Sequence, residues 1–126
     1  LLRWLARDLP VVRAMPNTPA LLGAGITGLC TGPGVHADDA ARATALLAAC
    51  GEVVTIADEA LMDAVTAVSG SGPAYFFLLV EALEAAGIAQ GLPADTARQL
   101  ATATAAGAAR MAAAGTSTPA RLREQV

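Results

Sequence analysis

Two short stretches of the sequence combine residue types that could bind a ligand. The first, Ser69-Gly70-Ser71-Gly72-Pro73, interrupts an apolar run that resumes at once on its far side. Pro73 fixes φ for the start of a helix, and glycines let the backbone turn sharply and approach a ligand closely. A bare helix N-terminus here, with its amides and the Ser69 and Ser71 hydroxyls, could receive a carboxylate or a phosphate. A capped joint without a ligand is the alternative interpretation of this Ser-Gly segment (residues 69–73).

The second stretch is Met15-Pro16-Asn17-Thr18-Pro19, which follows a short run rich in β-branched residues. Its two prolines restrict the backbone on either side of the Asn-Thr pair and would hold these polar side chains rigidly. Because α/β sheets bind ligands at the carboxyl ends of their strands, this N-T-P turn (residues 15–19) is the second candidate. An ordinary turn without a ligand is the alternative.

A G-x-G-x-x-G pattern at residues 23–28 matches the fingerprint of dinucleotide pyrophosphate sites. That fingerprint requires a strand before it and a helix that opens within it, whereas two more glycines and a proline follow at residues 32–34. The pattern is therefore interpreted as a glycine-rich entry into a strand.

Ser71 also invites a nucleophile hypothesis, but it lacks the glycines of the G-x-S-x-G elbow. A serine hydrolase would further need His36, the single histidine, to fold back onto Ser71. No metal site is expected, because no second histidine could complete it. The acidic residues at 58–63 fit the positive end of a helix dipole.

Composition limits the classes of function. The chain has 126 residues, 55% of them apolar, and a net charge of −3 without a basic cluster, which argues against a nucleic-acid partner. The apolar run at residues 73–80 ends at Glu81, short of the roughly 20 residues that a membrane helix needs. Cys30 and Cys50 fit neither a redox pair nor a zinc knuckle and are expected to be buried, reduced thiols. A soluble, cytoplasmic protein is expected.

The hydrophobic pattern predicts an α/β part followed by a helical part. Asp58 is a predicted N-cap, after which only helical signals occur, so a domain boundary is placed between residues 57 and 58. Small residues, mostly alanines, along the predicted helix at residues 93–114 would let a neighbouring helix approach closely. The helical part alone would have a thin hydrophobic core, which favours burial against a second copy in a homodimer. The predicted strands are residues 11–15, 26–31 and 53–56; the predicted helices are residues 1–9, 37–50, 58–68, 73–90, 93–114 and one that opens at Pro119.

Taken together, V-V-R-A-M-P-N-T-P-A at residues 11–20 and D-A-V-T-A-V-S-G-S-G-P-A-Y-F-F at residues 63–77 resemble the pyrroline-5-carboxylate reductase family. Further segments at residues 81–93 and 118–126 follow in that family's order. The resemblance implies the C-terminal part of a Rossmann-type dinucleotide-binding domain over residues 1–57. A truncated all-helical dimerisation and substrate-binding domain, of the 6-phosphogluconate dehydrogenase C-terminal type, would follow over residues 58–126.

The implied activity is reduction of the cyclic imine 1-pyrroline-5-carboxylate to L-proline with NADPH or NADH, the last step of proline biosynthesis. The enzyme would work as a homodimer or higher homo-oligomer. The resemblance also implies missing sequence at both ends, including the true pyrophosphate fingerprint and a substrate loop, so this piece alone is expected to be inactive. Gly115-Thr116-Ser117-Thr118 departs from the family, which often has an acidic residue there.

The resemblance assigns roles to eight residues and identifies no catalytic acid or base. A non-catalytic helical dimerisation module related to such reductases remains the alternative function. The cofactor-binding residues would be Met15, Pro16, Asn17 and Thr18, and the substrate-binding residues Thr66, Ser71, Gly72 and Pro73.

Overall fold

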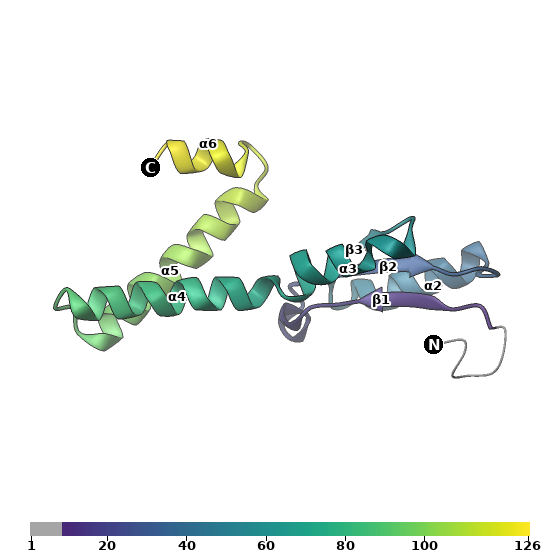
Figure 1. Cartoon of the computed structure of the whole chain (residues 1–126), viewed down its shortest axis with the longest axis horizontal. Coiled ribbons are helices and arrows are strands. Elements are labelled where there is room, and N and C mark those ends of the chain that lie inside the picture. The colour runs from purple at the N-terminus through teal and green to yellow at the C-terminus, as the bar shows by residue number, and fades with distance from the viewer. Residues whose placement is uncertain (1–8) are drawn as a thin grey trace. The chain divides into compact units, whose positions relative to one another are not determined.

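The computed structural model describes residues 9–126 (Figure 1). The chain divides after Pro73 into two compact units, which we call unit 1 and unit 2. The helix expected over residues 1–9 lies outside the described residues except for Leu9, which is in irregular structure.

Unit 1 is built on a three-stranded sheet with the order β1-β2-β3. The strands are β1 (Val12–Met15), β2 (Gly25–Thr31) and β3 (Gly51–Thr55). β1 runs antiparallel to β2, whereas β2 and β3 are parallel and are connected by α2 (Ala37–Ala48). A helix is the usual crossover between parallel strands. The predicted order of strand, strand, helix and strand is confirmed.

The core of unit 1 forms where the central strand β2 meets the helix that follows β3. Leu29 of β2 and Met62 of α3 (Met62–Val65) are almost completely inaccessible, at 1% and 0% exposure. Gly28 lets α3 approach the sheet, because a Cβ there would stand 2.6 Å from Cγ1 of Val65. Both cysteines are free thiols, and Cys30 is buried as expected, whereas Cys50 is exposed, so that expectation is wrong for Cys50.

Helical structure begins directly after Asp58. The Asp58 carboxylate accepts a hydrogen bond from the Ala60 amide at 2.9 Å, which confirms it as an N-cap. The successive segments are η2 (Glu59–Leu61), α3, the π-helical η3 (Thr66–Gly70) and α4 (Gly72–Ala89).

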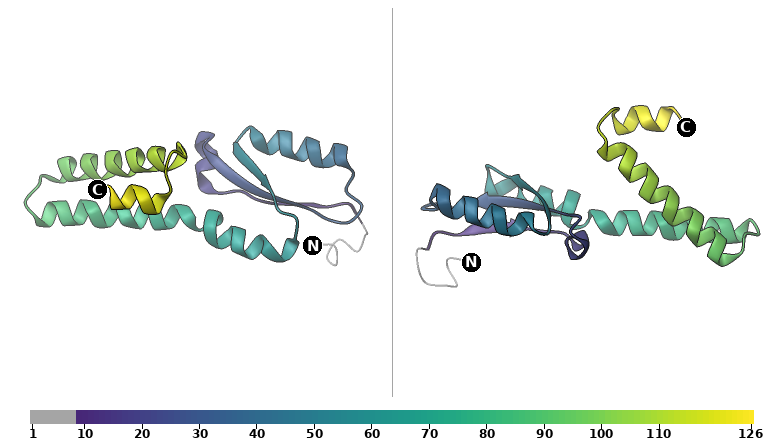
Figure 2. Two further views of the ribbon diagram at one scale, coloured as in Figure 1. Left: turned by 90° about the horizontal axis from the view of Figure 1, so that it is seen from above. Right: turned by 180° about the vertical axis from the view of Figure 1, so that it is seen from behind.

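Unit 2 contains most of α4, with α5 (Ala94–Ala113) and α6 (Pro119–Glu124). Figure 2 shows α5 turning back from the end of α4 and crossing it at an angle. The connection between them contains Gly91, whose φ is 96°. The two helices approach closely at small residues, as expected: a Cβ on Gly87 would stand 3.1 Å from the Ala97 Cβ. Across the same pair, Arg98 donates two hydrogen bonds to Glu84. That contact raises the pKa of the Arg98 guanidinium.

The surface of α4 is unusually apolar. The helical stretch Glu59–Ala89 is 31 residues long; its most apolar 18-residue window has a mean hydropathy of 1.3, and 6% of that window is buried in the chain. By length and composition alone it could cross a membrane. The uninterrupted apolar run seen in the sequence, residues 73–80, ends at Glu81. The helical structure continues on both sides of that run, so its length was underestimated from the sequence. A helix that is apolar all round needs a covering, either by lipid or by protein. The large side chains more than half exposed in its first turns are Tyr75, Phe76, Phe77, Leu78 and Leu79.

Candidate ligand site of unit 1

The N-T-P turn and the Ser-Gly segment lie together in unit 1. Asn17 Nδ2 donates a hydrogen bond of 3.2 Å to the carbonyl oxygen of Ser69, across 52 positions of sequence. The Met15 side chain lies against Gly70, since a Cβ on that glycine would stand 2.5 Å from the Met15 Cε. The two candidates chosen from the sequence therefore lie in contact and are considered as one candidate site.

The N-T-P turn is shaped by a short 3₁₀ helix that the sequence did not indicate. β1 ends at Met15, and η1 (Thr18–Leu22) follows with Pro19 in its first turn. Asn17 occupies the N-cap position in an extended conformation, but its side chain does not cap this helix. Instead, Asn17 Oδ1 accepts a hydrogen bond of 3.0 Å from the backbone amide of Ile26 in β2. Both ends of the Asn17 carboxamide thus hold backbone groups.

The Ser-Gly segment is reached through a π-helical turn rather than a break in the helix. The Ser71 amide donates to the Thr66 carbonyl at 2.8 Å, the i to i+5 bond that defines a π turn. The Thr66 hydroxyl donates to the Met62 carbonyl, and the Ser69 hydroxyl donates to the Val65 carbonyl. Such bonds to the preceding turn bend helices. The Thr66 and Ser69 hydroxyls therefore support the turn itself.

Ser71, Gly72 and Pro73 are the parts of this segment that remain available to a ligand. The half-buried Ser71 makes no side-chain hydrogen bond among the described residues. Gly72 is buried, yet an added Cβ would meet no atom within 4 Å beyond its own neighbours and local helix backbone. The expectation of a bare helix N-terminus is wrong for Ser71, because the Ser71 amide is already bonded to Thr66.

The site has no formal charge, since neither residues 15–18 nor residues 66–73 include an ionisable side chain. An exposed ion pair of 3.2 Å between Arg13 and Glu59 joins β1 to η2. Arg13 lies two residues before Met15, outside the two segments. An anionic ligand would therefore be met by hydroxyl and amide dipoles and not by a charged side chain.

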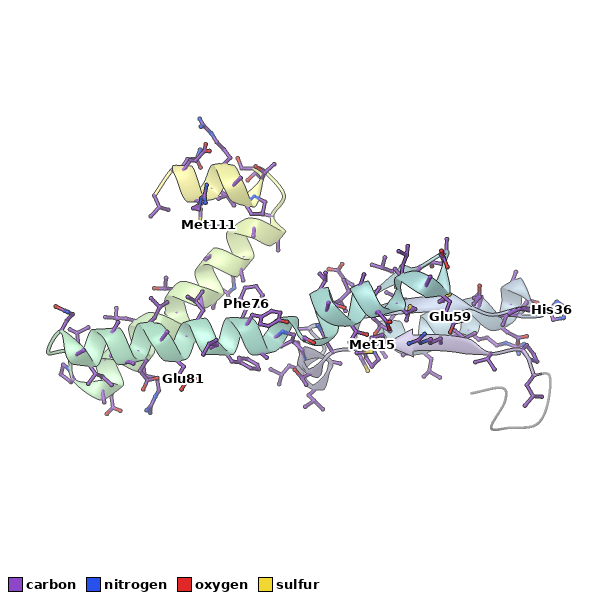
Figure 3. All side chains as sticks on the ribbon, viewed as in Figure 1. Met15, His36, Glu59, Phe76, Glu81 and Met111 are labelled. Carbon is purple, nitrogen blue, oxygen red and sulfur yellow. The ribbon has the colours of Figure 1, made fainter. Side chains whose placement is uncertain are left out.

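His36 does not belong to this site. It occupies the N-cap position of α2, beyond the end of β2 at Thr31, which pairs with Val12 at the start of β1. Met15, at the end of β1, pairs instead with Gly28 in the middle of β2. Figure 3 shows Met15 and His36 far apart along unit 1. The Ser71-His36 pair required by the hydrolase hypothesis is not formed. Among residues 9–126, no group of three His, Cys, Asp or Glu side chains could hold a metal ion.

The G-x-G-x-x-G pattern forms the entry into β2, as expected. Gly23, with φ of 68°, ends η1, and Gly25 and Gly28 lie within the strand. Gly25 is required because a Cβ there would stand 2.8 Å from the backbone of Ala20. Gly23 is therefore required by its backbone conformation, and Gly25 and Gly28 by close packing.

An apolar groove of about 340 Å³ also borders the π turn, at Val68 and Ser69. Ile26, Val54, Val65 and Val68 contribute to its lining, and the one hydroxyl, that of Ser69, already donates to the Val65 carbonyl. The groove lacks groups that could recognise a carboxylate, so the polar site described above is the stronger candidate.

The fold and this site define a class of protein: the chain is the C-terminal part of a Rossmann-type dinucleotide-binding domain followed by a helical domain. A family model described as pyrroline-5-carboxylate reductase dimerisation matches residues 59–126. The chain belongs to the pyrroline-5-carboxylate reductase family.

Individual relatives agree with this assignment. The pyrroline-5-carboxylate reductase of Pseudomonas aeruginosa is 52% identical over 123 residues, which are 98% of this chain and 45% of the relative. A solved structure of the Coxiella burnetii enzyme superposes with a TM-score of 0.88 at 41% identity, covering 98% of this chain and 46% of that one. The Plasmodium falciparum enzyme, solved with NADP bound, gives 0.87 at 32% identity, covering 94% and 48%. The chain thus spans less than half the length of each.

The family match begins at Glu59, next to the predicted domain start at residue 58, whereas the compact units divide after Pro73. The boundary at 57/58 remains a prediction. Three features of the site were not found from the sequence: the 3₁₀ helix η1, the π turn and the bridging role of Asn17. Thr66 and Ser69 were a possible signal for the π turn, because threonine and serine hydroxyls bond readily to the preceding helical turn.

Proposed function

We propose that the protein carrying this chain is an NAD(P)H-dependent pyrroline-5-carboxylate reductase that makes L-proline. The observation that supports this is the pairing of the N-T-P turn with the Ser-Gly segment through Asn17 and Met15. In the family resemblance these segments are the cofactor side and the substrate side of one reaction site. A reductase needs these two sides in contact, because hydride transfer requires the reacting carbons to be about 3 to 3.5 Å apart.

The N-T-P turn suits the nicotinamide end of a dinucleotide, and the bound cofactor would supply the hydride. Met15 and Pro16 offer apolar surface for a ring. Thr18 offers a hydroxyl, and Asn17 keeps one N–H and one lone pair beyond its two backbone bonds. Residues 9–126 include no glycine fingerprint in the setting that a pyrophosphate needs. In the proposal, the rest of the dinucleotide is held by sequence outside this chain.

The Ser-Gly segment would form the wall that receives the substrate. In the proposal, the Ser71 hydroxyl donates to the substrate carboxylate, and Gly72 leaves room for its ring. Thr66 helps to hold the wall through its bond to the Met62 carbonyl, and Pro73 opens α4 without an amide of its own. Because no residue of either segment is an acid, the proton that the imine nitrogen requires must come from elsewhere or arrive with the substrate.

The exposed apolar face of α4 supports assembly with a second copy of the chain. The family model that covers this helix is described as a dimerisation domain, and an exposed apolar patch of this kind marks an interaction surface. We therefore propose a soluble, cytoplasmic homodimer or larger homo-oligomer in which a partner, and not a lipid bilayer, covers α4.

The test is oxidation of NADPH and of NADH by the full-length protein with 1-pyrroline-5-carboxylate. Ser71→Ala should raise the KM for the imine by about tenfold, since it removes one hydrogen bond to a charged group. Thr44→Ala is the matched control, because it removes a hydroxyl that bonds only to the Ala40 carbonyl within α2. No turnover by a folded wild-type oligomer would instead favour the second candidate.

That second candidate is a non-catalytic helical dimerisation module. It is favoured by one observation: the family match covers the helical residues 59–126 and not the sheet. Such a module would form the oligomer but show neither nucleotide binding nor reductase activity.

A further inference from the structure

We propose that Asn17 is a positioning residue that locks the π turn of the substrate wall to the cofactor side of the site; this inference rests on the proposed function. Its carboxamide is the one side chain that joins the N-T-P turn and the Ser-Gly segment by hydrogen bonds among the described residues. Its partners fix its orientation. The Ile26 amide can only donate, which requires Oδ1, and the Ser69 carbonyl can only accept, which requires Nδ2.

Asn17 binds the helix at its π turn, where the regular α-helical hydrogen bonding is interrupted. A π turn is rarer than an α turn and occurs mostly as a single turn within an α-helix, frequently at functional sites. Here the Ser69 carbonyl, within the turn, is held from outside by Asn17. The Met15 side chain lies against the next residue, Gly70. The turn is therefore contacted twice, by Met15 at the end of β1 and by Asn17 two residues later.

The consequence reaches the two residues that follow. Ser71 leaves the turn through its amide bond to Thr66, and Gly72 begins α4. The directions of the Ser71 hydroxyl and of the open space at Gly72 depend on the geometry of the turn. Because Asn17 is anchored to β2 through Ile26, the wall is set by the sheet that also shapes the cofactor side.

Asn17→Asp in the full-length enzyme separates this role from a simple loss of folding. The aspartate retains an acceptor for the Ile26 amide but replaces the donor with an oxygen that repels the Ser69 carbonyl. We expect the KM for the imine to rise by roughly tenfold, and to rise more than the KM for the nucleotide, which Asn17 would also contact. Asn17→Ala, which removes both bonds, should be worse in both parameters. Thr44→Ala, which removes the Thr44 bond to Ala40, is the control and should change neither.

Hydrogen exchange gives a readout that does not depend on catalysis. Asn17→Asp should speed exchange in the peptide over residues 66–73, including the Ser71 amide, while the peptides of α2 and α5 keep their protection. A rise in nucleotide KM alone, with unchanged exchange at residues 66–73, would overturn the lock and indicate direct contact with the cofactor. Faster exchange throughout unit 1 would also overturn it, since it would show general destabilisation. If the wild-type protein has no turnover, the proposed function fails, and the exchange experiment still decides the lock.

Discussion

Gly72 and Gly34 are glycines for different physical reasons. Valine at Gly72 should therefore weaken substrate binding, whereas valine at Gly34 should lower stability. Gly34 has φ of 76°, a left-handed conformation that a β-branched residue adopts poorly. Gly72 is buried at the start of α4 and faces space where an added Cβ meets nothing within 4 Å. One position is constrained by its backbone, and the other by what must fit beside it.

We predict that Gly72→Val raises the KM for the imine at least tenfold in the full-length enzyme and changes the free energy of unfolding by less than about 0.5 kcal/mol. Gly34→Val should do the reverse: it should cost about 1 to 2 kcal/mol of stability and leave the KM unchanged. Urea unfolding and steady-state kinetics measure the two effects. Equal losses of substrate affinity in both variants would contradict the assignment of Gly72 to the substrate wall.

The pairing of the two candidate segments shows how far residue types alone could lead. Residues 15–19 and 69–73 were each recognisable from the sequence, since proline and glycine restrict or free the backbone locally. Their contact through Asn17 and Ser69 was not recognisable, because a hydrogen bond across 52 positions depends on the assembled sheet and helix. An Asn beside a turn is usually bonded within that turn, and here it bonds outside it.

The close packing of α4 on α5 depends on Gly87. A Cβ at this position would stand 3.1 Å from the Ala97 Cβ and 3.3 Å from Leu92 Cδ1. We predict that Gly87→Leu forces the helices apart and lowers the free energy of unfolding by about 1 to 3 kcal/mol. Urea unfolding of the full-length protein, followed by circular dichroism, measures this loss.

Gly107 provides the matched control within α5. An added Cβ there meets nothing within 4 Å, and glycine is a poor helix former. Gly107→Ala should therefore raise stability by about 0.5 to 1 kcal/mol. If Gly87→Leu were as stable as the wild type, the two helices would not be held at the distance that the structure gives.

Helix ends were predictable from the sequence where a local stop or cap exists. Asp58, Gly91 and Thr118 each occupy the predicted cap or stop, with side-chain caps at Asp58 and Thr118 and a φ of 96° at Gly91. The Ser-Gly segment misled because its residues are typical breakers, yet the chain continues as a π turn supported by the Thr66 and Ser69 hydroxyls. Breaker residues show where regular α geometry ends, not whether helical winding stops.

The chain taken alone leaves its most apolar helix uncovered, and this sets the main question about the assembled protein. Large side chains of α4 such as Phe76 and Phe77 are 62% and 65% exposed, and Figure 3 shows Phe76 on the surface of the helix. At about 25 cal/mol per Å² of apolar area, leaving several such side chains in water would cost several kcal/mol. A covering partner removes that cost, and a second copy brings the same helix to the interface.

Phe76→Asp tests this directly. We predict that the full-length wild-type protein sediments as a dimer or larger oligomer, and that Phe76→Asp shifts it to monomer at micromolar concentration, because burying an unpaired carboxylate costs several kcal/mol. Leu46→Asp is the matched control: Leu46 is 76% exposed on α2, outside the family's dimerisation region, and its variant should stay assembled. An oligomer that survives Phe76→Asp would remove α4 from the interface. A wild-type monomer that instead floats with phosphatidylcholine vesicles would show that lipid, and not a second chain, covers this helix.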